Sequence, residues 1–272
     1  MALTEPFITT HVQTSVTLGQ TLNSTVPVFD VSDSTIIGSA PASILLAGIG
    51  FKYQQSVKDW LAVHINFATV GRVGTSTTSL VSQGLTGSIS YHLGWIIRTH
   101  QSEDFLLSTS LGLGNNNATI INLLDWAGGI LEGVTVPLVR SHPALRGSAG
   151  VHAAWGLSNR FGLLGAIEMS YGESLDGFGT NQWYPDGRLA VSYDLEYDLR
   201  VPLGLALAGG IFDTDANTSI GETVWFWSAR LGLQTAGDFS IGLELSVNYT
   251  ENQEYGNSQQ ISQFTIDMRY YY

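Results

Sequence analysis

Three histidines, His64, His92 and His152, are the side chains of this chain whose spacing is best suited to chemistry. Each lies in a stretch in which large apolar residues occupy every second position, so each imidazole is expected on the opposite, polar face of a β-strand. Hairpin pairing about a loop midpoint near residue 78 places His64 opposite His92, and pairing across the next turn places Ser110 opposite His92. Paired imidazoles could bind a metal ion, and a histidine beside a serine could activate its hydroxyl as a nucleophile.

No HExxH or GxSxG motif, and no third ligand at a fixed spacing, accompanies these histidines. We therefore interpret them as polar residues that line an interior, together with Glu168 on the same kind of face. The sequence predicts no catalytic residue, no metal site and no cofactor, and we do not expect the chain to be an enzyme.

Charged residues on the inward face gather toward the end of the chain. Simple hairpin pairing places Arg230 opposite Glu244, Glu196 opposite Gly204 and Glu244 opposite Asp267. The expected charged belt consists of Arg188, Asp194, Glu196, Arg230, Glu244, Asp267 and Arg269. Such a belt either orients a polar solute at a constriction or is an ion-pair network that joins neighbouring strands, and the sequence leaves both interpretations open.

The composition narrows the class of protein. Of the 272 residues 44% are hydrophobic and only 12% are charged, whereas about a quarter is usual in a soluble domain. No run of about 18 apolar residues is present, so no transmembrane helix is expected. Cysteine is absent, which excludes disulfides and thiolate metal sites. The net charge of −12 argues against nucleic acid as a partner.

Alternation of apolar with small or polar residues recurs in about twelve segments, each long enough to cross an apolar band about 25 Å tall. The connections between these segments alternate in length. Short connections lie near 54–59, 99–104, 158–160, 199–201 and 235–238, and long ones near 19–42, 71–84, 115–146, 173–187, 213–222 and 251–259. Short turns at one end and long loops at the other are typical of a transmembrane β-barrel.

The connection at 115–146 interrupts the alternation, because its apolar residues lie near helical spacing after a run of asparagines. We predict a short helical insertion there. Since the inward residues of the other segments are mostly Gly, Ala and Ser, the interior has room for it. The segment either enters the interior as a plug or lies over the rim, and its candidate plug residues are Ile120, Leu124, Trp126 and Ile130.

The last ten residues, 263–272, read QFTIDMRYYY, and every second one is apolar or aromatic up to the final Tyr272. This strand resembles the closing strand of bacterial (Gram-negative) outer-membrane β-barrel proteins. The resemblance implies an all-β fold: an antiparallel transmembrane barrel of about twelve strands that spans 1–272 as a single domain, with short periplasmic turns and long extracellular loops. It implies recognition of the strand ending in Tyr272 by the barrel assembly machinery, and contact with outer-membrane lipid and lipopolysaccharide.

The resemblance also implies location in the bacterial outer membrane. The N-terminal residues MALTEPFITT lack the charged and apolar regions of a signal peptide, so we expect that such a peptide has been removed. The long loops carry most of the acidic residues, and an acidic mouth would favour cations or divalent ions.

The favoured function is passive passage of an unknown small solute through the lumen, in a channel or porin-like protein. One alternative is a secretion or export pore plugged by an internal segment, although no helix is expected within 1–42 to thread it. Another is a lipid-modifying enzyme of the phospholipase or lipid A deacylase type, but no histidine is expected on the outward face. A homo-oligomer is a further expectation, through the flat strand with Ala149, Val151 and Ala153.

Overall fold

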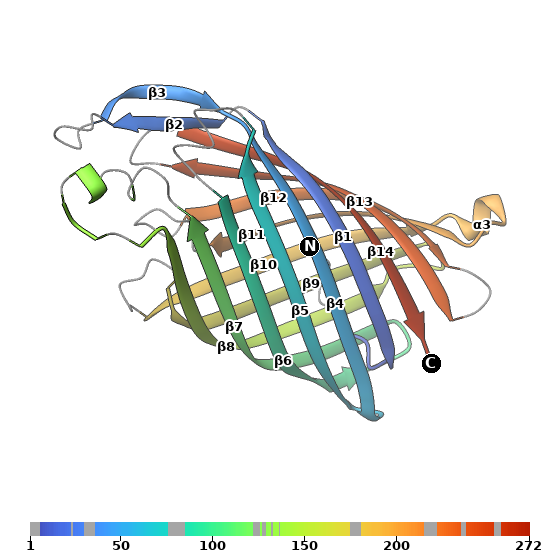
Figure 1. The fold of residues 1–272 in the computed structure, drawn as a ribbon. Coiled ribbons are helices and arrows are strands. Elements are labelled where there is room, and N and C mark those ends of the chain that lie inside the picture. Colours follow the sequence, from blue (N-terminus) through green and yellow to red (C-terminus); the bar gives the residue numbers. More distant parts are fainter. Residues whose placement is uncertain are drawn as a thin grey trace.

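The computed structural model describes residues 6–22, 24–29, 36–75, 85–121, 126, 129–131, 133–135, 137–174, 181–214, 222–234, 238–252 and 257–272. Twelve long strands close into one antiparallel barrel, in the order β1-β14-β13-β12-β11-β10-β9-β8-β7-β6-β5-β4 (Figure 1). The first strand therefore pairs with the last, which leaves the barrel without an open edge. The prediction of an all-β transmembrane-type barrel of about twelve strands is confirmed.

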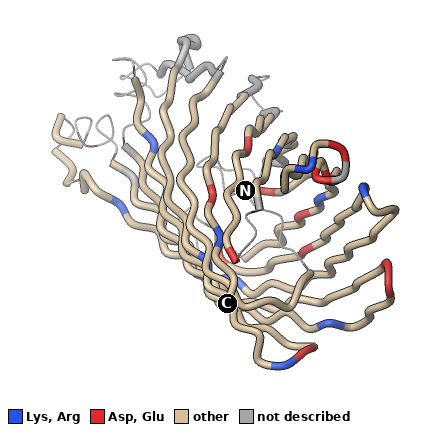
Figure 2. Tube along the Cα trace, turned by 90° about the vertical axis from the view of Figure 1, so that its right-hand side faces the viewer, with Lys and Arg blue, Asp and Glu red and all other residues tan. Residues whose placement is uncertain are grey.

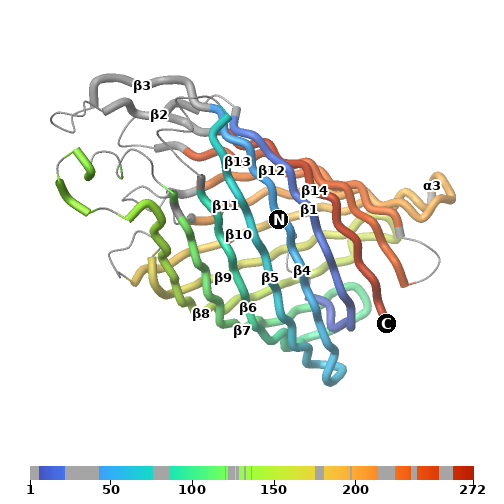
Figure 3. The backbone as a smooth tube through the Cα atoms, viewed as in Figure 1, coloured from blue at the N-terminus to red at the C-terminus, as the bar shows by residue number. Residues whose placement is uncertain are grey.

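The barrel strands cover most of the chain. They are β1 (His11–Leu22), β4 (Ile44–Lys58), β5 (Leu61–Gly74), β6 (Leu85–Gln101), β7 (Phe105–Ile121), β8 (Val139–Gly156), β9 (Phe161–Glu173), β10 (Asn181–Asp194), β11 (Leu203–Thr214), β12 (Glu222–Gln234), β13 (Phe239–Asn252) and β14 (Asn257–Tyr271). Their strong tilt is visible along the backbone tube in Figure 3. Tilt of this kind is required when a twisted sheet closes on itself.

The two faces of the wall differ as the alternation predicts. Ile49 and Phe51 point outward and are 59% and 43% exposed, whereas Gln54 and His64 point inward and are 1% and 3% exposed. An exposed apolar face would be unfavourable in water, but it suits contact with lipid chains, while backbone groups are satisfied by the closed hydrogen-bond ladder. No helix within the described ranges is long and apolar enough to cross a membrane.

The short connections lie at one end of the barrel, where the C-terminus and the single-turn helix α3 (Glu196–Leu199) are found (Figure 1). The connection between β7 and β8 lies at the opposite end. Before the second barrel strand, β2 (Ser24–Phe29) and β3 (Ile36–Ala42) form a separate two-stranded sheet. The long connection expected at 19–42 therefore contains this two-stranded sheet, and β1 continues into it as far as Leu22.

The boundaries expected for the 115–146 insertion are also wrong. Strands β7 and β8 continue through both ends of it, and Ile120 pairs with Arg140 in the wall, so Ile120 is not part of a plug. The asparagines at 115–117 hid this extension, because a strand that projects beyond the apolar band has water on both faces and loses its alternation. Trp126 and Ile130 lie at helical positions in the remaining connection and are exposed, and Leu124 lies outside the described residues.

Candidate lumen site

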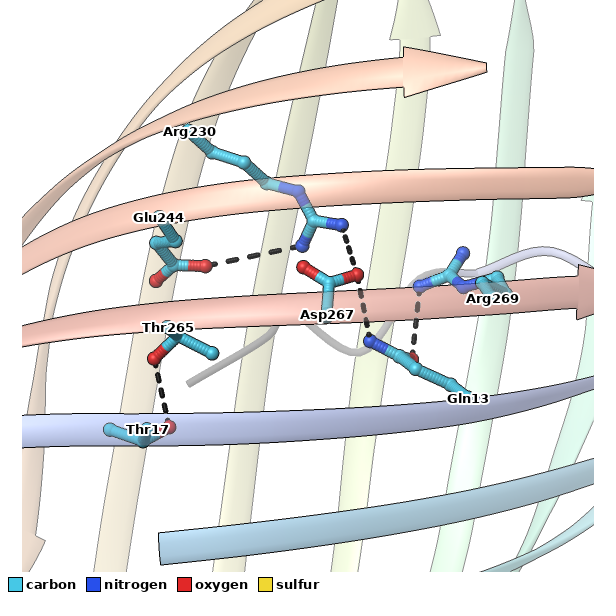
Figure 4. A network of polar contacts seen from close by, with 7 residues as sticks. All are labelled: Gln13, Thr17, Arg230, Glu244, Thr265, Asp267 and Arg269. Atoms are coloured by element: carbon cyan, nitrogen blue, oxygen red, sulfur yellow. Dashed lines mark hydrogen bonds and ion pairs between the residues drawn. The ribbon is translucent and has the colours of Figure 1, made fainter. Parts of the chain in front are cut away.

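An ion-pair network on the inner wall joins the strands at which the barrel closes. An Arg230 guanidinium nitrogen (Nη2) donates to Asp267 Oδ1 at 2.7 Å, and Nη1 lies 3.9 Å from Glu244 Oε2. Gln13 Nε2 donates to the same Asp267 oxygen at 3.4 Å, and Arg269 Nη2 donates to Gln13 Oε1 at 3.2 Å. Figure 4 shows these side chains meeting over β12, β13, β14 and β1.

The register explains which of these residues meet. Arg230 pairs directly with Glu244, as predicted. Glu244, however, lies opposite Thr265 and not opposite Asp267, so that part of the predicted register is wrong. Asp267 lies opposite Gly242, and Arg230 reaches it diagonally across that glycine.

The network is largely buried, since Asp267 and Arg269 are 3% and 5% exposed. Charges in such a place are stable only when paired and hydrogen-bonded, and each acidic group here has a basic or amide partner. Gln13 was not among the predicted site residues. The sequence signal that could have identified Gln13 is its position on the inward face of β1. This strand must pair with β14 when the barrel closes.

The remaining predicted belt residues do not join this network. Arg188 Nε donates to Asp186 Oδ1 at 2.6 Å, and Asp186 lies opposite Glu168, so these three form a second charged group on β9 and β10. Asp194 is the exposed last residue of β10 and lies opposite Gly204.

Glu196 does not lie on the inner wall. It begins α3, where its backbone N–H donates to Asp194 Oδ1 at 2.8 Å, and it is exposed. The prediction that Glu196 belongs to the belt is wrong, because the strand ends at Asp194 and the chain makes a helical turn instead of continuing the pairing.

The histidines form a polar row on the wall made by β5, β6 and β8. His64 Nε2 lies 3.3 Å from His92 Nδ1, and the two rings stack with centroids 5.3 Å apart. His92 Nε2 lies 3.3 Å from Ser148 Oγ. The expected proximity of His64 and His92 is confirmed, although they are diagonal neighbours, because His64 pairs directly with Gly94.

The predicted serine partner is different. Ser110 hydrogen-bonds His152 Nε2 at 2.8 Å and does not lie opposite His92, whose direct partner in β7 is Gly114. His152 is 1% exposed and therefore packed within the wall. Among the residues that the structure describes, no group of three or more His, Asp or Glu side chains is arranged to hold a metal ion.

A segment that the sequence interpretation missed lies on the lumen side of the wall. Residues 6–10, which we call the strap, precede β1. Ser108 Oγ donates to Pro6 O at 2.8 Å, and Gln54 Nε2 donates to Phe7 O and Thr9 O, both at 2.9 Å. Pro6, Gln54 and Ser108 are all less than 2% exposed.

The strap therefore leaves β1, passes β4 and reaches β7 across the lumen side of the barrel. The sequence predicts a strand from Ile8, whereas the structure has β1 begin at His11. No local sequence pattern predicts the strap, because its hydrogen-bond partners, Gln54 and Ser108, are single side chains that lie far from it in the sequence.

No protein-family model matches the sequence, and no curated protein matches it either. Among solved structures, an outer membrane channel from Pseudomonas putida F1 is similar, with a TM-score of 0.64 at 10% identity over 100% of this chain and 97% of that one. The transport unit of the autotransporter AIDA-I from Escherichia coli has a TM-score of 0.58 at 9% identity, over 100% and 93%. The NanC porin has a TM-score of 0.52 at 7% identity, over 95% and 100%.

At these identities the likeness shows the fold alone. The chain thus has the fold of bacterial outer-membrane barrels, and both channels and autotransporter transport units share it. A choice between those functions must come from the site, since one barrel architecture serves many activities.

Proposed function

We propose that this protein is a passive outer-membrane channel for small solutes. The observation that carries the proposal is a closed barrel with an inner wall of small and polar residues and with charged networks held on that wall. The strap lies on the lumen side of this wall, where it is held by side chains of β4 and β7. Solutes pass the remaining space under their own gradient.

Single-channel conductance of the refolded protein in a planar bilayer tests this proposal. Steady unitary current steps support it. A bilayer that stays silent over many insertions, verified by protein reconstitution, overturns it. Protein denatured by boiling before addition serves as the matched control and should give no steps.

A variant of the connection between β7 and β8 extends the conductance experiment. A variant that replaces residues 122–138 with a short Gly/Ser turn should conduct like the intact chain if the helical turn lies over the rim. If current rises only after this replacement, the connection is the plug that Trp126 and Ile130 were expected to form.

A secretion pore is the second candidate function, because the strap, which precedes β1, lies on the lumen side of the wall. An epitope tag placed before Met1 distinguishes the two. If external protease removes the tag from intact cells, the barrel exports its N-terminal extension; if the tag is protected until the outer membrane is opened, the strap stays in a channel.

Location and assembly follow from the same proposal. We propose the outer membrane as the site, with the apolar outer face against lipid and lipopolysaccharide, and the strand ending in Tyr272 as the segment bound by the assembly machinery. Membrane fractionation of expressing cells tests the location: recovery in the inner-membrane or soluble fraction would contradict it.

A further inference from the structure

The strap is held along a diagonal of the inner wall. Gln54 of β4 and Ser108 of β7 bind its backbone carbonyls, and Ala62 of β5 and Ile96 of β6 lie between these two anchors. Ala62 pairs directly with Ile96, and both are 0% exposed. Because both side chains lie on the inward face, the chain that crosses between the anchors covers them.

Histidines stand beside both anchors of the strap. Gln54 pairs with His11 on one side and with His64 on the other, and Ser108 pairs with His152. His64 lies close enough to His11 and His152 to interact with them electrostatically. Three of the six histidines of the chain thus flank the strap.

Carboxylates are scarce on this side of the wall. Strands β1 and β4 to β8, which carry the anchors and these histidines, contain no Asp or Glu. Figure 2 shows long stretches of strand without any charged residue. The charged or titratable groups that face the region from the surrounding strands are Lys52 of β4, His92 and Arg98 of β6, Glu168 of β9, and Arg269 and Tyr271 of β14.

A chain of hydrogen bonds runs along the wall from His64 to Glu168. Glu168 accepts a hydrogen bond from the Ser148 hydroxyl, so this hydroxyl accepts one from His92 Nε2, 3.3 Å away. A neutral His92 with its proton on Nε2 has a bare Nδ1, which accepts from His64 Nε2 at 3.3 Å. A neutral His64 with its proton on Nε2 in turn carries none on Nδ1.

His64 Nδ1 is therefore the atom of this chain that an added proton would occupy. His64 is 3% exposed, and its Nδ1 is buried without a hydrogen-bond partner among the described residues. A protonated Nδ1 would be a charged donor with no acceptor, which is unfavourable in a buried place. Water provides the acceptor once the strap leaves Gln54, the direct neighbour of His64.

We infer that acid releases the strap, and that His64 is the group that takes up the proton. The closed strap keeps His64 dry and neutral, whereas the released strap lets water stabilise the imidazolium, so proton uptake and release favour one another. The inference deepens the proposed channel function, on which it rests, because it assigns the opening of the passage to a fall in pH.

The mobility of a spin label on the strap tests the inference without conduction. The chain has no cysteine and the Phe7 side chain is 39% exposed, so Phe7→Cys provides a single labelling site. The protein is labelled while unfolded and then refolded into lipid vesicles. Between pH 7 and pH 5 the mobile fraction should rise at least about fivefold, because one proton taken up on release shifts the equilibrium by up to about tenfold per pH unit.

Substitutions in the labelled chain identify the group that responds. His64→Gln keeps a donor toward His92 but lacks the atom that takes up the proton, so its mobile fraction should change less than about twofold. His100→Gln is the matched control at an exposed position beside a short turn and should respond like the unaltered chain. Glu168→Gln should also respond, since its amide oxygen still accepts from Ser148. A response that is lost in Glu168→Gln and kept in His64→Gln would overturn the inference.

Gln54→Ala provides a second variant should His64→Gln not form a closed barrel, which heat-dependent gel migration shows. Its strap lacks the bonds to Phe7 O and Thr9 O, so the label should already be mobile at pH 7 and respond little to acid. A label that stays immobile at pH 5 in the unaltered chain would overturn the inference and leave a conducting barrel a channel. A strap that acid releases in a protein whose bilayer stays silent supports the inference, while the channel proposal fails.

Discussion

Gly242 has no side chain, and the Arg230 side chain occupies the space beside it. A methyl group at this position would overlap Asp267 Oδ2 and would lie 2.6 Å from Arg230 Nη2. The contact is with the far ends of two side chains, so the backbone can stay in place, but the ion pair cannot keep its geometry. At the residue scale, the absence of a side chain at Gly242 thus allows Arg230 of β12 to reach Asp267 of β14.

We expect Gly242→Ala to destabilise the barrel by about 1–3 kcal/mol, because it displaces the partner of a buried carboxylate. Urea unfolding in lipid vesicles measures the change. Gly232→Ala is the matched control, since it lies on the same inner wall of β12 and a methyl group there would meet nothing within 4 Å. Equal losses in the two variants would show that the ion pair has no part in the effect.

The pair of Arg230 and Asp267 should also be energetically coupled. Arg230→Gln leaves Asp267 buried without its cation, and Asp267→Asn removes the charge that attracts Arg230. The double variant should therefore be less destabilised than the sum of the single variants, by about 0.5–3 kcal/mol. Strict additivity in the same unfolding measurement would mean that the two side chains do not stabilise one another.

At the scale of the elements, the strap is attached differently from every strand. Strands pair through continuous backbone ladders, whereas the strap is held mainly by the side chains of Gln54 and Ser108. A few side-chain hydrogen bonds can break without disturbing the ladder, so the strap is the segment of the described barrel best suited to move. We therefore expect conduction through the barrel to increase when the hydrogen bonds that hold the strap are removed.

Gln54→Ala removes the hydrogen bonds to both Phe7 O and Thr9 O. The loss weakens the attachment by about 1–3 kcal/mol, so we expect wide openings to become at least about fivefold more frequent in single-channel records. The neighbouring Gln55 does not contact the strap in any bond that the structure describes, and its amide donates to Ser56 O instead. Gln55→Ala should therefore conduct like the unaltered protein, and a similar rise in both variants would contradict a gating role for the strap.

At the scale of the whole molecule, closure depends on one strand that pairs on both sides. β14 pairs with β13 over fourteen residues of its neighbour and with all twelve residues of β1. Without β14, the backbone groups of both neighbours would face lipid unpaired, which costs several kcal/mol for each group.

Deletion of residues 263–272 should thus abolish the closed barrel. The measurement is gel migration in SDS with and without heating, since a closed barrel resists unfolding and migrates as a compact form until it is boiled. Tyr272→Ala is the control when both variants are refolded in vitro, without the assembly machinery. Tyr272 follows the strand, and its backbone N–H makes one contact, with Thr10 O at 3.3 Å, while its ring stacks on Tyr270. A heat-sensitive compact form in the deletion variant would show that closure does not need β14.

The architecture was predictable because its signal is local. A strand alternates its side chains with a period of two, so the outward positions of Ile49 and Phe51 and the inward positions of His64 and His92 follow from their own neighbours in sequence. The composition and the alternating loop lengths then required a barrel of about twelve strands. The local pattern is lost where water covers both faces of a strand, as at 115–117, and there the sequence predicts a loop whereas the structure has strand β7.

The sequence by itself thus determined the barrel, the inward face for residues such as His64, His92 and Asp267, and the pairing of Arg230 with Glu244. Only the tertiary structure decided that Arg230 binds Asp267, that His92 contacts Ser148, that Glu196 leaves the wall in a helical turn and that the strap enters the lumen. The physical reason is that the two-residue repeat of a strand sets the face on which a side chain lies, whereas the side chains it contacts depend on the register between strands. Register is fixed by the exact centre of each turn and by closure of the ring, to which residues far apart in the sequence all contribute.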